Sequence, residues 1–264
     1  MTISVLLERT DDLLEKIYRH LEDPNLSLLF DTTELALYAD QSPLWLETPT
    51  HSAFLEAIRN EPVNWPGLII ESEADAQTLL THLRHILLVR FGQGRKGVLR
   101  YSHPTTASYL FPVDDVQAGP TWMGPISCLT WYGGTWSDLA LGGQRWISID
   151  NPKALQWKAV ENMTPVHLSA PYEQALQRQQ KEHFLYQWWE KHDTTPYPQA
   201  EKYLQDGMSS GFAQAAELNE YLSLRAHHPS QDAPHVPPHG TSEDRLEQMR
   251  LHLERNQQDK ESLT

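Results

Sequence analysis

The chain has 264 residues, which is long enough for one large domain or two smaller ones with a buried core. Hydrophobic residues make up 39% of it, which is typical of a globular protein. Its 35 acidic and 21 basic residues give a net charge of −14, which excludes binding to nucleic acid or anionic membrane through a broad basic surface.

Periodic apolar residues predict helices and strands in alternation over residues 1–160. Thr10 and Thr50 are expected to cap two helices, and the pattern Ser72-x-x-Asp75 predicts a capping box before a third. Strands are expected at residues 26–30, around Trp45, and at 67–71, 86–91, 98–101, 127–132 and 145–149. We therefore predict the α/β class, with an N-terminal lobe whose mixed sheet is flanked by helices.

The composition changes near residue 160 and predicts a smaller C-terminal α-helical lobe at residues 161–228. Tyr172, Leu176, Phe184 and Trp188 recur at multiples of four, which is the helical spacing. Residues 229–240 are rich in proline and histidine and are expected to be a linker. Residues 241–264 form a charged amphipathic tail whose apolar stripe is narrow, so we expect the tail to be mobile or to be ordered by a partner.

Three glycines with the spacing Gly92-x-Gly94-x-x-Gly97 resemble a dinucleotide-binding fingerprint. In such a site a helix follows the third glycine and its N-terminus binds the pyrophosphate. Here the residues after Gly97 are strand-like, so a polar hairpin loop is the better interpretation. No cofactor is expected.

Other candidate catalytic or metal-binding patterns are weak. His82 and His85 are three residues apart on a predicted helix, but no third ligand stands at a recognisable spacing. Cys128, the single cysteine, lies in an apolar run and is expected to be an inert core thiol. A single cysteine allows no intramolecular disulfide, and the N-terminus lacks the basic start of a signal peptide, so we expect a cytoplasmic protein.

Tryptophan is abundant, with nine in the chain. Exposed aromatic residues are typical of the energetically dominant positions in protein–protein interfaces. Trp136, Trp188, Trp189 and Phe212 are the candidate partner-binding residues. Packing in a core is the alternative for each of them.

An ordered series of motifs runs from residue 28 to residue 131. It consists of an apolar strand ending in Asp31, a strand beginning at Gly67, a helix over Leu79–Val89, Arg100-Tyr-Ser-His-Pro104, and Gly124-Pro-Ile126 before a strand with Trp131. In this order the motifs resemble the effector-chaperone, or adaptor, family of bacterial type VI secretion, catalogued as domain of unknown function 4123. His103 stands where the family pattern has aspartate.

The resemblance implies a non-enzymatic adaptor that binds a toxic effector and helps to load it onto the spike protein VgrG. The expected partners are thus the cognate effector and VgrG, with no nucleic acid and no membrane, and the chain is expected to be a monomer outside that complex. Structural roles are expected for the motif residues Asp31, Gly67, Arg100, His103, Pro104, Gly124 and Pro125. From its planar guanidinium, Arg100 is expected to bind a turn carbonyl or an acidic side chain. The alternatives are a small metal- or nucleotide-dependent enzyme and a structural accessory of a tail or tube.

Overall fold

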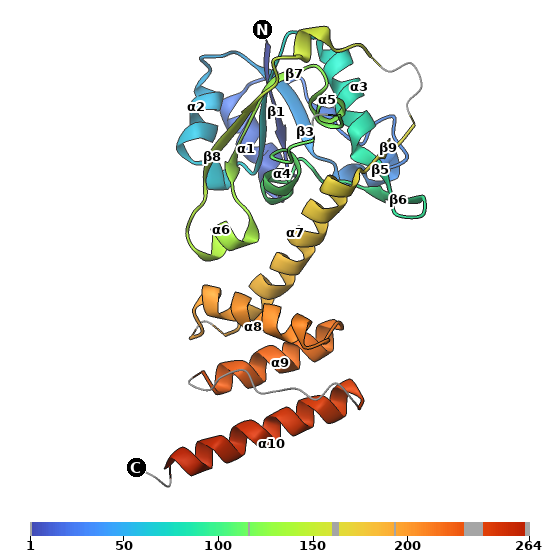
Figure 1. Cartoon of the computed structure of the whole chain (residues 1–264). Coiled ribbons are helices and arrows are strands. Elements are labelled where there is room, and N and C mark those ends of the chain that lie inside the picture. Colours follow the sequence, from blue (N-terminus) through green and yellow to red (C-terminus); the bar gives the residue numbers. More distant parts are fainter. Residues whose placement is uncertain (1, 116, 160–163, 193, 230–239, 262–264) are drawn as a thin grey trace. The chain divides into compact units, whose positions relative to one another are not determined.

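The computed structural model describes residues 2–115, 117–159, 164–192, 194–229 and 240–261 (Figure 1). The chain divides into two compact units, Met1–Gln179 and Gln180–Thr264, and the division falls inside helix α7 (Ala170–Trp189). The first unit combines a sheet with helices, and the second is helical. The predicted α/β class with a C-terminal helical region is therefore confirmed.

The first unit is built on a six-stranded sheet with the order β2-β3-β1-β4-β7-β8. Its strands are β1 (Thr2–Leu7), β2 (Ser27–Leu28), β3 (Leu44–Thr48), β4 (Gly67–Ser72), β7 (Ile126–Gly133) and β8 (Arg145–Asp150). All neighbouring strands of this sheet pair antiparallel. A second sheet has the order β6-β5-β9 and is mixed, because β5 pairs parallel with β9 and antiparallel with β6. Its strands are β5 (Leu88–Phe91), β6 (Arg95–Val98) and β9 (Val166–His167).

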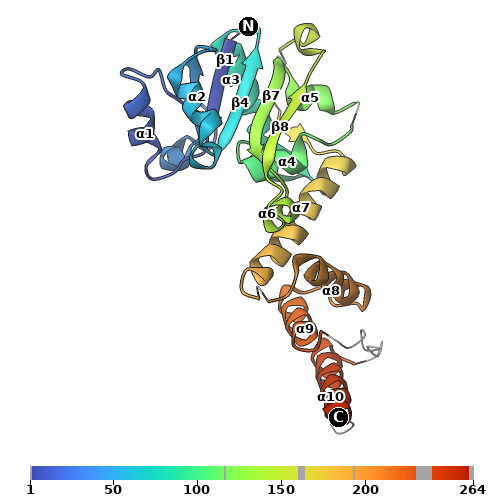
Figure 2. The same ribbon diagram turned by 90° about the vertical axis from the view of Figure 1, so that its left-hand side faces the viewer.

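The two faces of the large sheet contribute to two hydrophobic clusters. Val5 and Leu7 point to the face covered by α1 (Leu13–His20) and α2 (Ala53–Asn60), where they pack with Phe54 and Ile58. Leu6 points to the opposite face, which α3 (Ala76–Leu87), α4 (Pro104–Leu110) and α5 (Gly119–Met123) help to cover. Figure 2 shows α1 and α2 on one side of the sheet and α4 and α5 on the other. Strand β1 is therefore buried on both faces.

The helices begin near the expected places, but their caps differ from those predicted. Asp12 rather than Thr10 is the N-cap of α1, and Ser52 rather than Thr50 caps α2 through a bond from the backbone N–H of Leu55. Asp75 alone caps α3. The hydroxyl of Ser72 instead donates to the Pro125 carbonyl at 2.7 Å, so the predicted capping box is wrong. Serine, threonine and aspartate all favour the N-cap position. The sequence therefore did not show which of two neighbouring candidates caps each helix.

The second unit contains the end of α7 together with α8 (Tyr197–Ser209), α9 (Ala215–His227) and α10 (Ser242–Glu261). Most of the predicted linker lies outside the described residues. Within this unit, Leu246, Met249 and Leu253 of α10 are all buried. The tail was expected to be mobile or to be ordered by a partner. Its apolar stripe is instead covered within the chain itself, and the mobility of the tail stays a prediction. None of the helices in the described ranges is both long enough and apolar enough to cross a bilayer.

Candidate protein-binding site

The Arg100–Pro104 motif lies between β6 and α4 and contacts the end of β1. The guanidinium of Arg100 forms an ion pair with Glu8, and the hydroxyl of Ser102 donates to the other oxygen of the same carboxylate. Glu8 is only 4% exposed, whereas the Arg100 side chain is 55% exposed. Arg100 thus binds an acidic side chain, one of the two roles expected for it, and shields a carboxylate that burial would otherwise destabilise.

His103 begins α4 and acts as its N-cap. Its Nδ1 accepts a hydrogen bond from the backbone N–H of Thr105 at 3.3 Å, and Pro104 takes the first helical position. Desolvation by the surrounding protein, with a contribution from the Arg100 cation, lowers the pKa of His103. A neutral ring with an unprotonated Nδ1 can accept this bond, as an aspartate cap would. Histidine at this position therefore caps α4 as an aspartate would.

Two surface hollows meet at Arg100 and Gln41, and we call them together the Arg100 groove. The first, of about 290 Å³, is mainly apolar and is lined by Phe30, Leu35, Tyr38, Gln41, Val98 and Arg100. The second, of about 500 Å³, is polar and is lined by Arg9, Thr10, Asp11, Asp40, Gln41 and Arg100. Tyr38 is 53% exposed and Val98 44% exposed. Partly exposed apolar side chains beside charged ones make this surface a candidate for protein binding.

The glycine loop forms a hairpin turn, as predicted. Strands β5 and β6 pair antiparallel from Leu88↔Val98 to Phe91↔Arg95, so the residues between them cannot begin a helix. Gly92 and Gly94 have positive φ angles of 53° and 82°, which glycine adopts without steric cost. This geometry leaves no helix N-terminus at which a pyrophosphate could bind.

The two histidines of α3 point to different surroundings. His82 is 2% exposed, and its Nε2 donates to the Trp122 carbonyl at 3.1 Å. His85 instead bonds to the Thr164 carbonyl at 2.8 Å. Among the described residues there is no group of three potential metal ligands. Cys128 is half-buried beside the hydroxyls of Thr130 and Ser148, so the prediction of a core thiol is wrong.

The remaining motif residues lie where backbone geometry or the core needs them. A Cβ on Gly67 would lie 2.3 Å from the Leu6 carbonyl oxygen, so glycine allows β4 to approach β1. Gly124 has a φ of 50°, and a Cβ there would meet the ring of His82 at 2.3 Å. Pro125 follows it and accepts the bond from Ser72 through its carbonyl. Asp31, by contrast, is exposed at the end of the segment that follows β2.

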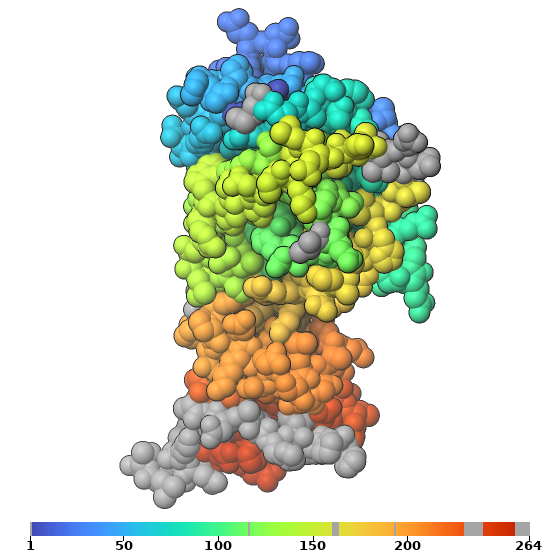
Figure 3. All heavy atoms as spheres, turned by 45° about the horizontal axis from the view of Figure 1, so that its top comes forward, coloured from blue at the N-terminus to red at the C-terminus, as the bar shows by residue number. Residues whose placement is uncertain are grey.

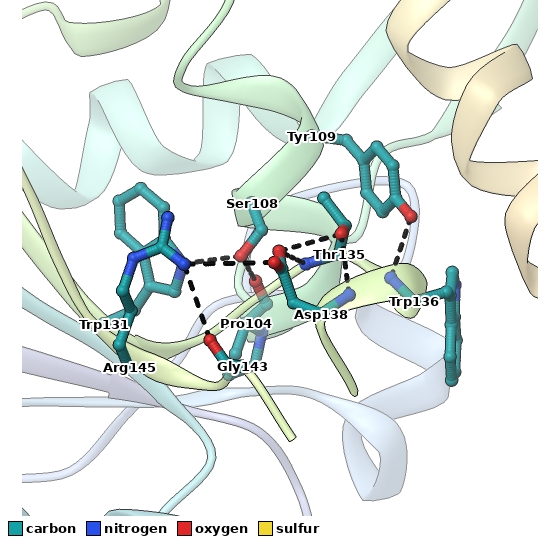
Figure 4. Close-up of polar contacts among 9 residues, drawn as sticks. All are labelled: Pro104, Ser108, Tyr109, Trp131, Thr135, Trp136, Asp138, Gly143 and Arg145. Carbon is teal, nitrogen blue, oxygen red and sulfur yellow. Dashed lines mark hydrogen bonds and ion pairs between the residues drawn. The ribbon is translucent and has the colours of Figure 1, made fainter. Parts of the chain in front are cut away.

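A polar network fixes Trp136 at the start of α6 (Trp136–Ala140). Figure 4 shows its backbone N–H donating to the hydroxyl of Tyr109, at 2.9 Å, while its indole points away from the network. Thr135 and Asp138 form a capping box, and Asp138 is 3.9 Å from Arg145 in an ion pair. Trp136 is the candidate aromatic residue that lies in the first unit, and it is half-buried.

The candidate aromatic residues of the second unit are more enclosed. Trp188 is 4% exposed and stacks on His192, with ring centroids 4.1 Å apart. Phe212 is 1% exposed and lies under the guanidinium of Arg245. Trp189 is half-buried, and its indole N–H donates to the Thr195 carbonyl at 2.8 Å. In this structure Trp188 and Phe212 pack in the core, the alternative considered for them, and their surfaces are closed to a partner.

Comparison with known proteins gives one match. A family model described as Domain of unknown function (DUF4123) matches residues 5–117, which is less than half of the chain. The matched segment includes Glu8, the Arg100–Pro104 motif and the residues that line the Arg100 groove, and it ends before β7. No curated protein and no solved structure matches the chain.

The sequence prediction did not identify two parts of this site. Glu8 was not singled out, although a carboxylate directly after the apolar run Val5–Leu7 signals a polar contact at a strand end. The short 3-10 helix Ala36–Gln41, which carries Tyr38, has no periodic apolar face to reveal it. Both parts were found only because the fold brings β1 and this helix to Arg100.

Proposed function

We propose that this chain is a non-enzymatic adaptor of type VI secretion. In the cytoplasm it binds a toxic effector and helps to load it onto the spike protein VgrG. The observation that carries the proposal is the match of residues 5–117 to the DUF4123 model, over the segment that builds the Arg100 groove. The role in secretion comes from the resemblance of the ordered motifs to the adaptor family.

The groove has the chemistry that such a role needs. Phe30, Tyr38 and Val98 offer apolar contacts, and the buried Glu8 with its bond from Ser102 fixes the Arg100 guanidinium at the junction with the polar hollow. A rigid cation beside apolar surface favours a partner that places a carboxylate or carbonyl next to an apolar side chain. The alternative of a nucleotide- or metal-dependent enzyme has no support from the glycine hairpin or from His82.

The decisive experiment measures binding of the full-length protein to its candidate partners. The effector encoded beside the gene and VgrG are each titrated by calorimetry, and the wild-type protein is expected to form a stable complex with both. The variant Tyr38→Asp is expected to weaken one of these complexes about tenfold, because it puts a charge into an apolar contact. Tyr18→Asp is the matched control, since Tyr18 is equally exposed, at 56%, but lies on α1 and does not line the groove.

Two results would contradict the proposal. One is the absence of binding to both effector and VgrG by the wild-type protein. The other is self-assembly of the purified chain into large particles, which would favour a structural accessory of a tail or tube.

A further inference from the structure

Strand β8 is a long edge strand whose charged side chains, Arg145 and Asp150, stand only at its two ends. Figure 1 shows β8 beside β7, and the strand order places β8 at one edge of the six-stranded sheet and β2 at the other. Strand β8 has six residues, whereas β2 has two. Its sequence, Arg-Trp-Ile-Ser-Ile-Asp, contains no proline, glycine or lysine, and its pairing with β7 runs without a bulge. Natural sheets normally block such an edge, because unpaired backbone groups recruit another strand.

The backbone groups that β8 directs outward can be assigned from its pairing. The N–H of Asn151 donates to the Ser127 carbonyl at 2.7 Å, one step beyond the pair Cys128↔Asp150. In an antiparallel ladder the inward hydrogen bonds recur at every second residue. The N–H and C=O groups of Trp146, Ser148 and Asp150 therefore point away from β7, and no hydrogen bond given for the described residues uses them.

The side chains of β8 also leave apolar surface open on both faces of the sheet. Trp146 is 38% exposed and packs edge-on against Tyr132 of β7, with ring centroids 5.6 Å apart. On the other face, Ile147 and Ile149 are half-buried at the margin of the core. An added strand with apolar side chains would cover both faces, because side chains alternate along it.

Exposed leucines flank the two ends of this strand in sequence. Leu141 precedes β8 and is 62% exposed, and Leu155 follows it and is 81% exposed. Figure 3 shows the yellow-green and yellow segment that follows β8 on the surface of the first unit. Exposed apolar side chains are thus found in the segments before and after the strand as well as in it.

We propose that β8 binds an extended segment of the cargo effector, which adds to the sheet as a seventh strand. This inference rests on the proposed function and names the site and form of one partner. The segment has apolar side chains next to Ile147 and Ile149 and a cationic side chain next to the exposed Asp150. Pairing of β8 with a second copy of the chain is disfavoured, because each copy carries a net charge of −14.

The test compares two substitutions at one position. Ser148→Pro removes an outward N–H without removing a bond to β7, whereas Ser148→Ala removes only the hydroxyl that bonds to Thr130. For the full-length protein and the effector encoded beside it, we expect Ser148→Pro to weaken binding about tenfold and Ser148→Ala to change it little. Binding to VgrG is expected to be the same for both variants.

A second measurement does not depend on the folding of a variant. In the free wild-type protein, the backbone N–H groups of Trp146, Ser148 and Asp150 should exchange rapidly with solvent. In the effector complex the same groups should be protected from exchange. Effector binding with unchanged exchange in β8, or equal affinity of a folded Ser148→Pro variant, would overturn this inference and leave the proposed function intact. No binding of effector by the wild type would contradict both. A dimer of the free protein that Ser148→Pro abolishes would show that β8 pairs with a second copy instead.

Discussion

Acidification is expected to destabilise the first unit through His82. This side chain is 2% exposed, donates to the Trp122 carbonyl, and lies edge-on to Trp157. Burial lowers the pKa of His82 from 6.5 to about 4. Because the unfolded chain binds the proton near pH 6.5 and the folded chain does so only near pH 4, the stability present above pH 6.5 is lost as the pH falls through this window.

The size of the effect follows from the two pKa values. A difference of one pKa unit corresponds to about 1.4 kcal/mol, so the free energy of unfolding should fall by about 3 kcal/mol in all, most of it between pH 6.5 and 4.5. Below pH 4 the contribution of His82 is constant, because both states then bind the proton. Losses from other groups add to this one and require a control.

Two measurements check the prediction. NMR titration of the ring gives the pKa of His82 directly, and urea unfolding followed by hydrogen exchange in β1 and β4 reports the stability of the first unit at pH 7.5 and pH 4.5. His82→Gln should lose the His82 part of the pH dependence, whereas His85→Gln, three residues further along α3, should keep it. A His82 ring that titrates near pH 6.5, or the same pH dependence in His82→Gln as in the wild type, would refute the reasoning.

Three further outcomes are expected. Gly67→Ala should lower the free energy of unfolding by at least about 1–3 kcal/mol, because the added Cβ would lie 2.3 Å from the Leu6 carbonyl oxygen. An unchanged melting temperature would contradict this close approach of β4 to β1. Arg100→Ala should destabilise the protein more than Glu8→Gln does, because it leaves the buried Glu8 carboxylate without its cationic partner, whereas the glutamine amide carries no charge. Denaturant titration of both variants ranks their stabilities. The reverse order would exclude a role of Arg100 in stabilising the Glu8 carboxylate. Removal of residues 241–264 should speed hydrogen exchange in α9, because Leu246, Met249 and Leu253 are buried within the same unit, and unchanged exchange would show that the stripe contributes nothing.

The strands with one open face and clear turn signals could be predicted from the sequence. β7 and β8 were located to within a residue or two, because polar and apolar residues alternate along β8 and glycines flank both strands. β1 was missed, although it is the third strand in the order of the sheet. Both of its faces are buried, so apolar residues of Ile3–Leu7 lie on both faces and Ser4 is the one polar residue among them. The segment therefore lacks the regular alternation that marks a half-exposed strand.

Helix α8 lies inside the helical lobe predicted at residues 161–228, but its bounds were not predicted, and the reason is a different one. Gly207 lies inside it and lowers the helical propensity of the segment. A Cβ at this position would lie 2.8 Å from the ring of Tyr221, so the packing of α8 on α9 requires the glycine. A residue that weakens the local signal is here needed by the tertiary structure.

The candidate site was predicted only in part, because its contacts join distant segments. Arg100 was correctly expected to bind an acidic or carbonyl group, but Glu8 is 92 residues away in sequence, and nothing local to either residue specifies the pair. The same holds for Trp188 and Phe212. Their aromatic character is visible in the sequence, but their burial depends on helices whose packing is not.

The border of the matched family segment cuts through a single folding unit. β4 lies within residues 5–117, but it pairs with β7, which begins at Ile126. A fragment ending at residue 117 would leave β4 as an open edge and would remove the fully buried Trp131 from the core. Chimaeras made from chains of this kind should therefore exchange the whole segment up to α7, since the smallest piece expected to fold alone is larger than the piece that sequence comparison detects.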